Sequence, residues 1–230
     1  MPVYNEGKVI ETTIEQVEKA VKAPHELLIV YDMDEDTTVE PVKKLHKKYP
    51  NVLLVKNIFG RGALNALKTG LEKARGDAVC IMMADLTDDS RVVNAMQEKF
   101  GEGYDIVAAS RYMKGGHQVG GPFIKQILSR IAGISLHFLV GLPTHDATNS
   151  FKLYSKRFLN KTKIEADGGF ELGLELTVKA FFSGYNIAEV PTTWTYSAKE
   201  SRFYLKKWLP KYLKWYFWAI NKKLHGFPTK

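Results

Sequence analysis

Three clusters of acidic and polar residues are the parts of this sequence best suited to chemistry. They are Pro2-Val3-Tyr4-Asn5-Glu6-Gly7, the run from Asp32 to Thr38, and the run from Ala84 to Asp89. Carboxylates can accept hydrogen bonds from a base or ribose, or hold a divalent cation against a diphosphate. Such residues also cap helices, and one cluster alone would be explained that way. Three clusters at matched positions favour one shared site.

Two further segments could serve the same site. Gly60-Arg61-Gly62 precedes a helical pattern, where glycine lets a nucleotide approach the backbone and Arg61 adds positive charge. Helix entry also favours glycine, so this pair is weak evidence by itself. Asp146 opens a Thr/Asn/Ser-rich bend, and it is a candidate general base for a hydroxyl acceptor. A turn-forming aspartate is the competing interpretation.

The first half of the chain alternates short apolar runs with amphipathic helical patterns. The spacing predicts helices at 10–21, 39–45, 63–74 and 92–96, and strands at 27–31, 52–55, 78–83 and 106–109. Such alternation predicts a mostly parallel sheet, in which ligands bind outside the carboxyl ends of the strands. The strand expected before Pro2 is either cut off or unusually short.

The second half of the chain does not continue the regular alternation of strands and helices. We expect a helix at 123–139, a polar turn at 144–150, a strand at 151–154, a helix at 170–182 and strands at 187–190 and 192–196. The glycine-rich stretch 115–121 is a candidate mobile loop over the acceptor. Residues 203–224 form an aromatic, lysine-rich segment in which Pro210 bends a helix or begins a new one.

The amino-acid composition is typical of a chain that folds around a hydrophobic core. The 230 residues are 45% hydrophobic and 25% charged, which excludes a disordered chain and suits one domain. The net charge of +8 favours anionic partners, and the single Cys80 excludes an intrachain disulfide framework. The most apolar long window, 127–142, contains Arg130 and His137 and is short for a membrane span. We therefore expect no transmembrane helix and only peripheral membrane contact.

The carboxyl-terminal segment is the candidate membrane contact. It is rich in lysine and contains Trp208, Trp215 and Trp218. As a helix, it would place aromatic side chains at the depth of the lipid headgroups and lysines on anionic lipid. Packing on the protein's own core and binding of single-stranded nucleic acid are the alternatives.

The motifs, in their order, resemble family 2 glycosyltransferases. The resemblance rests on Pro-Val-Tyr-Asn-Glu, Tyr-Asp-Met-Asp-Glu-Asp-Thr-Thr, Gly-Arg-Gly-Ala-Leu-Asn-Ala and Met-Ala-Asp-Leu-Thr-Asp-Asp. Later motifs look like the dolichol-phosphate mannose synthase and polyprenyl-phosphate glycosyltransferase branch: Ser110-Arg111-Tyr112, Asp146-Ala-Thr-Asn-Ser-Phe-Lys152, Gly169-Phe170-Glu171, Glu189-Val190-Pro191 and Glu200-Ser201-Arg202-Phe203. Together they extend from residue 2 to about residue 215.

The resemblance implies an α/β fold of the GT-A type: a Rossmann-like nucleotide-binding domain with a mostly parallel central sheet, plus a C-terminal amphipathic interfacial helix. The domain would cover residues 1–200, and the membrane-associating tail residues 201–230. It implies an inverting hexosyltransferase that moves a sugar from GDP-mannose or a UDP-sugar to polyprenyl or dolichyl phosphate. Mg²⁺ or Mn²⁺ would be the cofactor. The enzyme would lie peripherally on the cytoplasmic face of an anionic membrane, with no nucleic-acid partner.

The resemblance also assigns residues by position. The donor would contact Pro2, Tyr4, Glu6, Asp32, Arg61, Ala84 and Asp85. Asp85 would bind the metal alone or with help from Asp88 or Asp89. Arg111 and Arg202 would hold phosphates, and Asp146 would lie beside the acceptor; with Asp85 these form the predicted catalytic set. Two positions depart from the family pattern, because Met83 and Tyr31 stand where it has acids.

Two other functions fit the same sequence. One is a glycosyltransferase with a soluble or hydroxyl acceptor, which would need Asp146 as its base. The other is a catalytically silent protein that binds a nucleotide-sugar, which Met83 and Tyr31 favour. Donor binding without turnover would identify the second.

Overall fold

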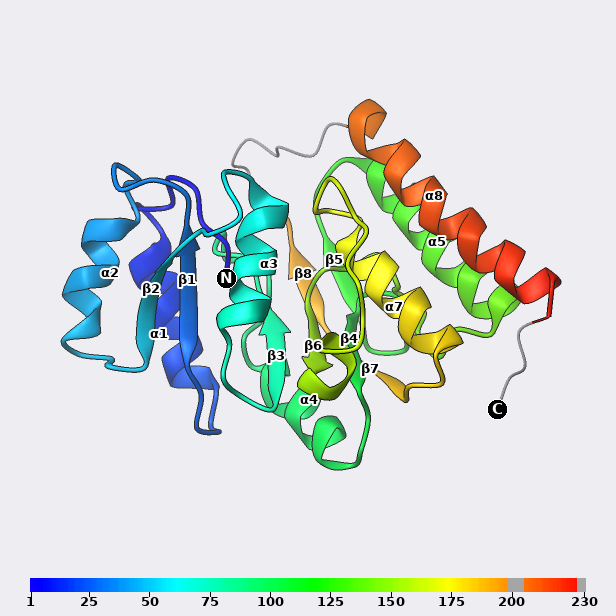
Figure 1. The fold of residues 1–230 in the computed structure, drawn as a ribbon, viewed down its shortest axis with the longest axis horizontal. Coiled ribbons are helices and arrows are strands. Elements are labelled where there is room, and N and C mark those ends of the chain that lie inside the picture. Colours follow the sequence, from blue (N-terminus) through cyan, green and yellow to red (C-terminus); the bar gives the residue numbers. More distant parts are fainter. Residues whose placement is uncertain (198–204, 227–230) are drawn as a thin grey trace.

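The structure is a computed structural model that describes residues 1–197 and 205–226 (Figure 1). The helices are α1 (Ile10–Ala20), α2 (Val39–His46), α3 (Ala63–Lys73), α4 (Val92–Gly101), α5 (Phe123–Val140), α6 (Lys156–Leu159), α7 (Leu172–Phe182) and α8 (Leu205–Leu224). The strands are β1 (Leu27–Tyr31), β2 (Val52–Lys56), β3 (Ala78–Ile81), β4 (Ile106–Ser110), β5 (His117–Val119), β6 (Lys152–Ser155), β7 (Ile187–Pro191) and β8 (Thr193–Thr195). The predicted elements are all present, and β5 and α6 are additions.

Parallel pairing dominates the sheets, as the alternating pattern predicted. β1 pairs with β2, β4 with β7, and β5 with β8, all in parallel. The four-stranded sheet has the order β3-β6-β4-β7, and β6 runs antiparallel to both of its neighbours. The stretch 115–121, expected as a mobile loop, contains β5 and is held to β8.

The strand expected before the first polar cluster is made by the first three residues. Pro2 forms a parallel bridge to Val30. The amide of Val3 donates to the Val30 carbonyl, and the amide of Val30 donates to the Met1 carbonyl, both at 2.9 Å. Residues 1–3 therefore pair with β1 and hold the first polar cluster beside its end.

Helices cover the sheet on both faces, because alternate strand residues point to opposite sides. On one face, Ile14 of α1, Val42 of α2 and Met96 of α4 pack around Ile29 and Val107. On the other, α3 and α7 pack on the alternate strand residues, through Leu67, Leu71, Leu172, Leu176, Ile81 and Ile106. The sheet is therefore the middle layer of a three-layer α/β core.

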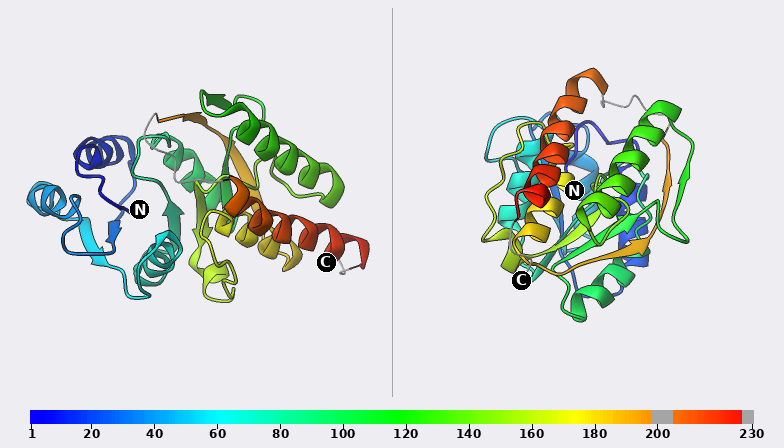
Figure 2. Two further views of the ribbon diagram at one scale, coloured as in Figure 1. Left: turned by 90° about the horizontal axis from the view of Figure 1, so that it is seen from above. Right: turned by 90° about the vertical axis from the view of Figure 1, so that its right-hand side faces the viewer.

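The carboxyl-terminal helix packs on the protein itself. α8 lies beside α5 and α7 (Figures 1 and 2) and continues through Pro210. Trp208 and Trp215 are buried, and Trp215 belongs to the same buried cluster as Leu136 of α5 and Leu174 of α7. The expectation that Trp208 and Trp215 face lipid headgroups was wrong, because both rings are buried against the protein: Trp215 in the cluster between the three helices, and Trp208 against Phe170, with ring centroids 4.9 Å apart. The division into residues 1–200 and 201–230 stays a prediction.

The expectation of no transmembrane helix stays a prediction, but the helix in this region is longer than the apolar window in the sequence suggested. α5 is 18 residues long with a mean hydropathy of 1.3, enough by length and composition to cross a membrane, and only 17% of it is buried. The sequence window began too late, since Phe123 and Ile124 belong to the same helix. α5 is therefore an exposed apolar helix attached to the core through Gly133, Leu136 and Val140.

Gly133 provides a test of how α5 is attached. A Cβ at this position would lie 2.3 Å from the backbone oxygen of His145, whereas a Cβ on the helical Gly101 meets nothing within 4 Å. We expect Gly133→Ala to lower the free energy of unfolding by about 1–3 kcal/mol. Gly101→Ala, the matched control, should raise it by about 0.5–1 kcal/mol. Urea unfolding measures both, and equal effects would contradict this packing.

Candidate active site

The predicted clusters meet at one edge of the sheets. β1, β3 and β4 end there, and each is followed by candidate site residues. Because β6 is antiparallel, its first residue lies at the same edge: Lys152 stands opposite Ile81 of β3 and Ala108 of β4. The bend that begins at Asp146 therefore joins residues that are distant in the sequence.

The first cluster is anchored by Asp36. Its two carboxylate oxygens accept hydrogen bonds from the amide of Asn5, at 3.1 and 3.0 Å, and one also accepts from the amide of Thr38. Thr38 Oγ1 in turn accepts from the amide of Glu6. Asp36 is 3% exposed. Its role is structural, and Tyr4, 43% exposed, is left at the surface of the edge.

Asp32 joins the end of β1 to the glycine loop. Its Oδ1 accepts from the side-chain amide of Asn57 at 2.8 Å, and its Oδ2 accepts from the amide of Gly62 at 2.9 Å. Arg61 is exposed beside this contact. Asn57 was missed in the sequence, since it lies outside the three clusters; its place at the end of β2 was the available signal.

Asp85 lies in a tight loop after β3. Its Oδ1 accepts from the amide and the hydroxyl of Thr87, at 3.2 and 2.7 Å. Leu86 has a φ of 64°, a left-handed conformation that a leucine rarely adopts. Ala84 is buried and accepts from Thr13 of α1 at 2.8 Å, which ties the loop to the core.

Asp88 is the second acid of this loop that can act with Asp85. Its Oδ2 accepts from the amide of Met83 at 3.0 Å. Burial, together with the charge of Asp85, raises the pKa of Asp88 to about 7. A divalent cation bound between the carboxylates of Asp85 and Asp88 would favour their ionised forms and so lower this pKa again. Asp89 points elsewhere and pairs with Arg91 at 2.8 Å.

The residues present suit a cation that is shared with a ligand. Within residues 1–197 and 205–226, no three His, Cys, Asp or Glu side chains are grouped to hold a metal ion. Mg²⁺ usually binds through one or two carboxylates, waters and substrate phosphates. Asp85 and Asp88 fit that mode, whereas a closed all-protein metal site does not.

A buried ion pair joins the end of β4 to the bend before β6. Arg111 Nε lies 2.7 Å from Asp146 Oδ2, and Arg111 Nη2 lies 2.9 Å from Asp146 Oδ1. Asp146 also accepts from the amides of Arg111 and Asn149 and from the hydroxyl of Thr148. Asp146 is fully buried, and the Arg111 side chain is 10% exposed. Burial opposes ionisation, but the charge and hydrogen bonds of Arg111 outweigh it and hold the pKa of Asp146 below its usual range.

Arg111 is fixed from a second side by α5. Its Nη2 donates to Ser129 at 3.0 Å, and its guanidinium lies over the ring of Tyr112. Nη1 donates to no residue in the described part of the chain. Ser129 was missed because nothing in its helical segment suggested chemistry. Arg202 lies outside the described residues.

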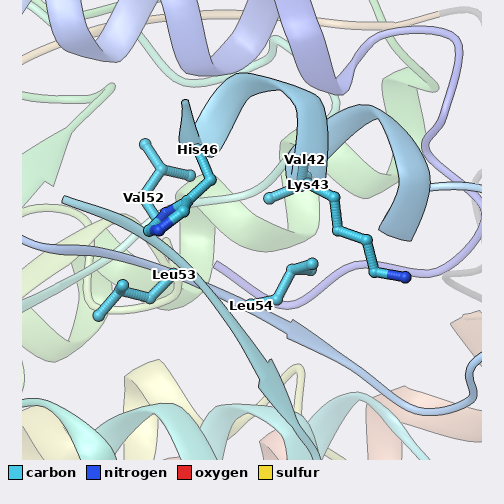
Figure 3. A pocket seen from close by; sticks show the side chains of 6 residues that line it. All are labelled: Val42, Lys43, His46, Val52, Leu53 and Leu54. Carbon is cyan, nitrogen blue, oxygen red and sulfur yellow. The ribbon is translucent and has the colours of Figure 1, made fainter. Parts of the chain in front are cut away.

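His145, beside Asp146, faces away from the ion pair. Its Nδ1 lies 2.6 Å from Glu189 Oε1, and its ring stacks on that of His137 at 4.0 Å. The hollow shown in Figure 3, about 310 Å³ between α2 and β2, is lined by Val42, Lys43, His46, Val52, Leu53 and Leu54. It contains no predicted site residue and no carboxylate.

Acids at the strand ends, a glycine loop and a buried arginine thus lie at the carboxyl ends of the strands of an α/β protein. The family model "Glycosyl transferase family 2" matches residues 1–162. The chain therefore belongs to glycosyl transferase family 2, a family of glycosyltransferase enzymes. The predicted family and enzyme class are confirmed.

Relatives of known name agree with this assignment. The chain is 27% identical over 219 residues to a dolichol-phosphate mannosyltransferase of Pyrococcus furiosus, covering 93% of this chain and 60% of that protein. It is 28% identical to a polyprenol monophosphomannose synthase of Mycolicibacterium smegmatis, covering 85% of this chain and 76% of that one. The chain thus spans about three fifths of the Pyrococcus protein.

The fold is shared with solved glycosyltransferases. Glucosyl-3-phosphoglycerate synthase from Mycobacterium tuberculosis, in a complex with Mn²⁺, UDP and glucosyl-3-phosphoglycerate, matches with a TM-score of 0.69 and 17% identity. The match covers 99% of this chain and 79% of that one. The predicted GT-A fold with a mostly parallel core is confirmed.

We expect a large loss of stability when the negative charge of Asp146 is removed from the ion pair. Asp146→Asn leaves the Arg111 guanidinium buried without its counter-charge, and we expect a loss of about 3–5 kcal/mol in the free energy of unfolding. Because the folded pKa of Asp146 is depressed, its stabilisation is present above about pH 4 and fades as the pH falls through the folded value. Asp146→Asn should therefore also be less sensitive to acid.

Glu40→Gln, which removes an exposed partner of Lys43, is the control and should change little. Urea unfolding at neutral and acid pH measures both effects. A loss for Asp146→Asn as small as that of the control would contradict the buried pair.

Proposed function

We propose that this protein is an inverting glycosyltransferase that passes a hexose from a nucleotide-sugar to a polyprenyl or dolichyl phosphate at a membrane surface. One observation carries the choice of acceptor: Asp146 is fully buried and accepts five hydrogen bonds, two of them from the guanidinium of Arg111. A carboxylate held in this way has no free position from which to deprotonate a hydroxyl. A phosphate acceptor is already ionised and needs no such base.

Arg111 is the group that would receive the acceptor phosphate. Its Nε and Nη2 are committed to Asp146, which leaves Nη1 to donate to an anion. Arginine with a fixed guanidinium binds phosphate oxygens well because its donors are planar and already oriented. The names of the Pyrococcus and Mycolicibacterium relatives, both of which act on a polyprenol or dolichol phosphate, support this acceptor.

The donor would bind along the edge formed by the first three clusters. Asp32 would accept from the base, Tyr4 and Glu6 would contact the nucleoside, and Pro2, Arg61 and Ala84 would complete the pocket. GDP-mannose is the first donor to test, because both named relatives transfer mannose. Asp85 and Asp88 would hold a divalent cation; a solved protein of the same fold contains Mn²⁺ and UDP, which supports a divalent cofactor.

The reaction is a direct displacement at the anomeric carbon. A phosphate oxygen of the acceptor forms the new bond to C1 while the bond from C1 to the donor phosphate breaks, and the nucleoside diphosphate leaves. Mg²⁺ or Mn²⁺ would neutralise the charge that develops on the leaving group. Arg111 holds and orients the attacking phosphate, and Arg202 is a second candidate for a phosphate contact.

Transfer can be measured directly with purified protein, GDP-mannose, Mn²⁺ and polyprenyl phosphate, with UDP-glucose and UDP-N-acetylglucosamine as alternative donors. Asp85→Ala should lower transfer by about a hundredfold or more, since it removes a charge at the leaving group. Asp89→Asn, in the same loop but paired with Arg91, is the matched control and should retain activity. Donor binding without transfer to any lipid phosphate would contradict the proposal.

We also propose that α5 and α8 place the site against a membrane. The two helices lie side by side (Figure 2) and expose large apolar side chains: Phe123, Ile124, Ile127, Ile131, Phe138 and Leu139 on α5, and Leu213, Phe217 and Leu224 on α8. Exposed lysines of α8, including Lys207 and Lys214, suit anionic lipid. α5 also carries Ser129, which contacts Arg111, so a membrane on this helix would present a lipid phosphate near the arginine.

Vesicle binding tests this surface. Ile124→Glu with Ile131→Glu replaces two exposed side chains, each of which would contribute about 2 kcal/mol when buried in lipid. We expect binding to phosphatidylglycerol-containing vesicles to fall more than tenfold, as measured by co-sedimentation. Ile58→Glu, at an equally exposed position after β2, is the control and should bind normally. Unchanged binding of the double variant would contradict the assigned surface.

A further inference from the structure

Lys152 is a buried cation that the reaction described above does not use. It is the first residue of β6 and is fully buried, although lysine is rarely buried without a specific partner. Its Nζ donates to the carbonyl of Ala147 at 3.0 Å and to the carbonyl of Asn149. Both acceptors belong to the bend that follows Asp146.

The bend that Lys152 holds also contributes hydrogen bonds to Asp146, the carboxylate that pairs with Arg111. Asn149 donates its amide to Asp146 Oδ1, and its side chain donates to the carbonyl of Ala109 in β4 at 2.8 Å. Gly173 of α7 closes the other side, where a Cβ would lie 2.9 Å from the Asn149 oxygen and 3.4 Å from Lys152 Nζ. The bend is therefore fixed between a charged donor and a helix.

Burial makes a cation at this position costly. It lowers the pKa of Lys152 to about 7; the charge of Asp146 opposes this shift, and the charge of Arg111 adds to it. An apolar side chain of similar length would avoid the cost but would leave two backbone carbonyls without a donor. A lysine at position 152 is therefore better explained by its hydrogen bonds to these two carbonyls than by packing.

We propose that Lys152 is a positioning residue for the acceptor: its ammonium fixes the carbonyls of Ala147 and Asn149, so that Asp146 keeps Arg111 aimed at the acceptor phosphate. The inference deepens the proposed function and rests on it for the identity of the acceptor.

Three variants separate positioning from simple stability. Lys152→Met removes the donors and keeps the length, and Lys152→Arg restores a charge with N–H donors. Lys156→Met is the matched control, because Lys156 also donates to a backbone carbonyl, that of Leu71, but follows the opposite end of β6. Each variant is titrated with farnesyl phosphate and with GDP plus Mn²⁺, and amide hydrogen exchange is measured at Arg111 and Asn149.

We expect Lys152→Met to weaken farnesyl phosphate binding more than tenfold and GDP binding less than twofold, with faster exchange at both amides. Lys152→Arg should recover most of the binding, and Lys156→Met should change neither ligand. Equal weakening of both ligands, or unchanged exchange at Arg111 and Asn149, would overturn the inference. If the unsubstituted protein binds no farnesyl phosphate, the proposed acceptor is wrong, and the exchange result alone decides the role of Lys152.

Discussion

The acceptor side of this protein depends on the buried pair of Arg111 and Asp146. The pair connects the end of β4 with the bend before β6 and, through Ser129, with α5. Removing two charges from water is costly, and the cost is offset only when geometry and hydrogen bonding are both good. Here two guanidinium nitrogens and three other donors satisfy one carboxylate. The arrangement makes Arg111 rigid and takes Asp146 out of acid–base chemistry.

The segments proposed to contact the donor combine strained backbone with carboxylates that hold it in place. Among the described residues, Asn5 and Leu86 are the non-glycine residues with a positive φ, and each lies in a cluster predicted to contact the donor. Asp36 holds the first segment through the amide of Asn5, and Thr87 holds the second through Asp85. Strained residues persist only where their surroundings hold them, and they gather at functional sites. Each of the two segments therefore combines one residue of positive φ with a carboxylate that accepts hydrogen bonds from the segment.

The sequence was sufficient to predict the layers and the edge where the site lies, because apolar periodicity and polar strand ends are local signals. It was not sufficient to predict contacts between distant residues. Asp146 was a candidate base until Arg111, 35 residues away, was seen to cover it. Trp215 has the pattern of an interfacial aromatic residue, but which neighbour covers an apolar face is decided by tertiary packing against Leu136 and Leu174. The antiparallel direction of β6 could not be predicted either, because it also depends on pairing between distant segments.

We propose that the acceptor must bring its own negative charge, because Asp146, the carboxylate beside Arg111, already accepts five hydrogen bonds from the described part of the chain. Transfer from GDP-mannose to polyprenyl phosphate and to the polyprenol of equal length, in the same vesicles, tests this claim directly. We predict that the sugar appears on the phosphate and not on the alcohol. Comparable labelling of the alcohol would show that a base is available and would contradict the account.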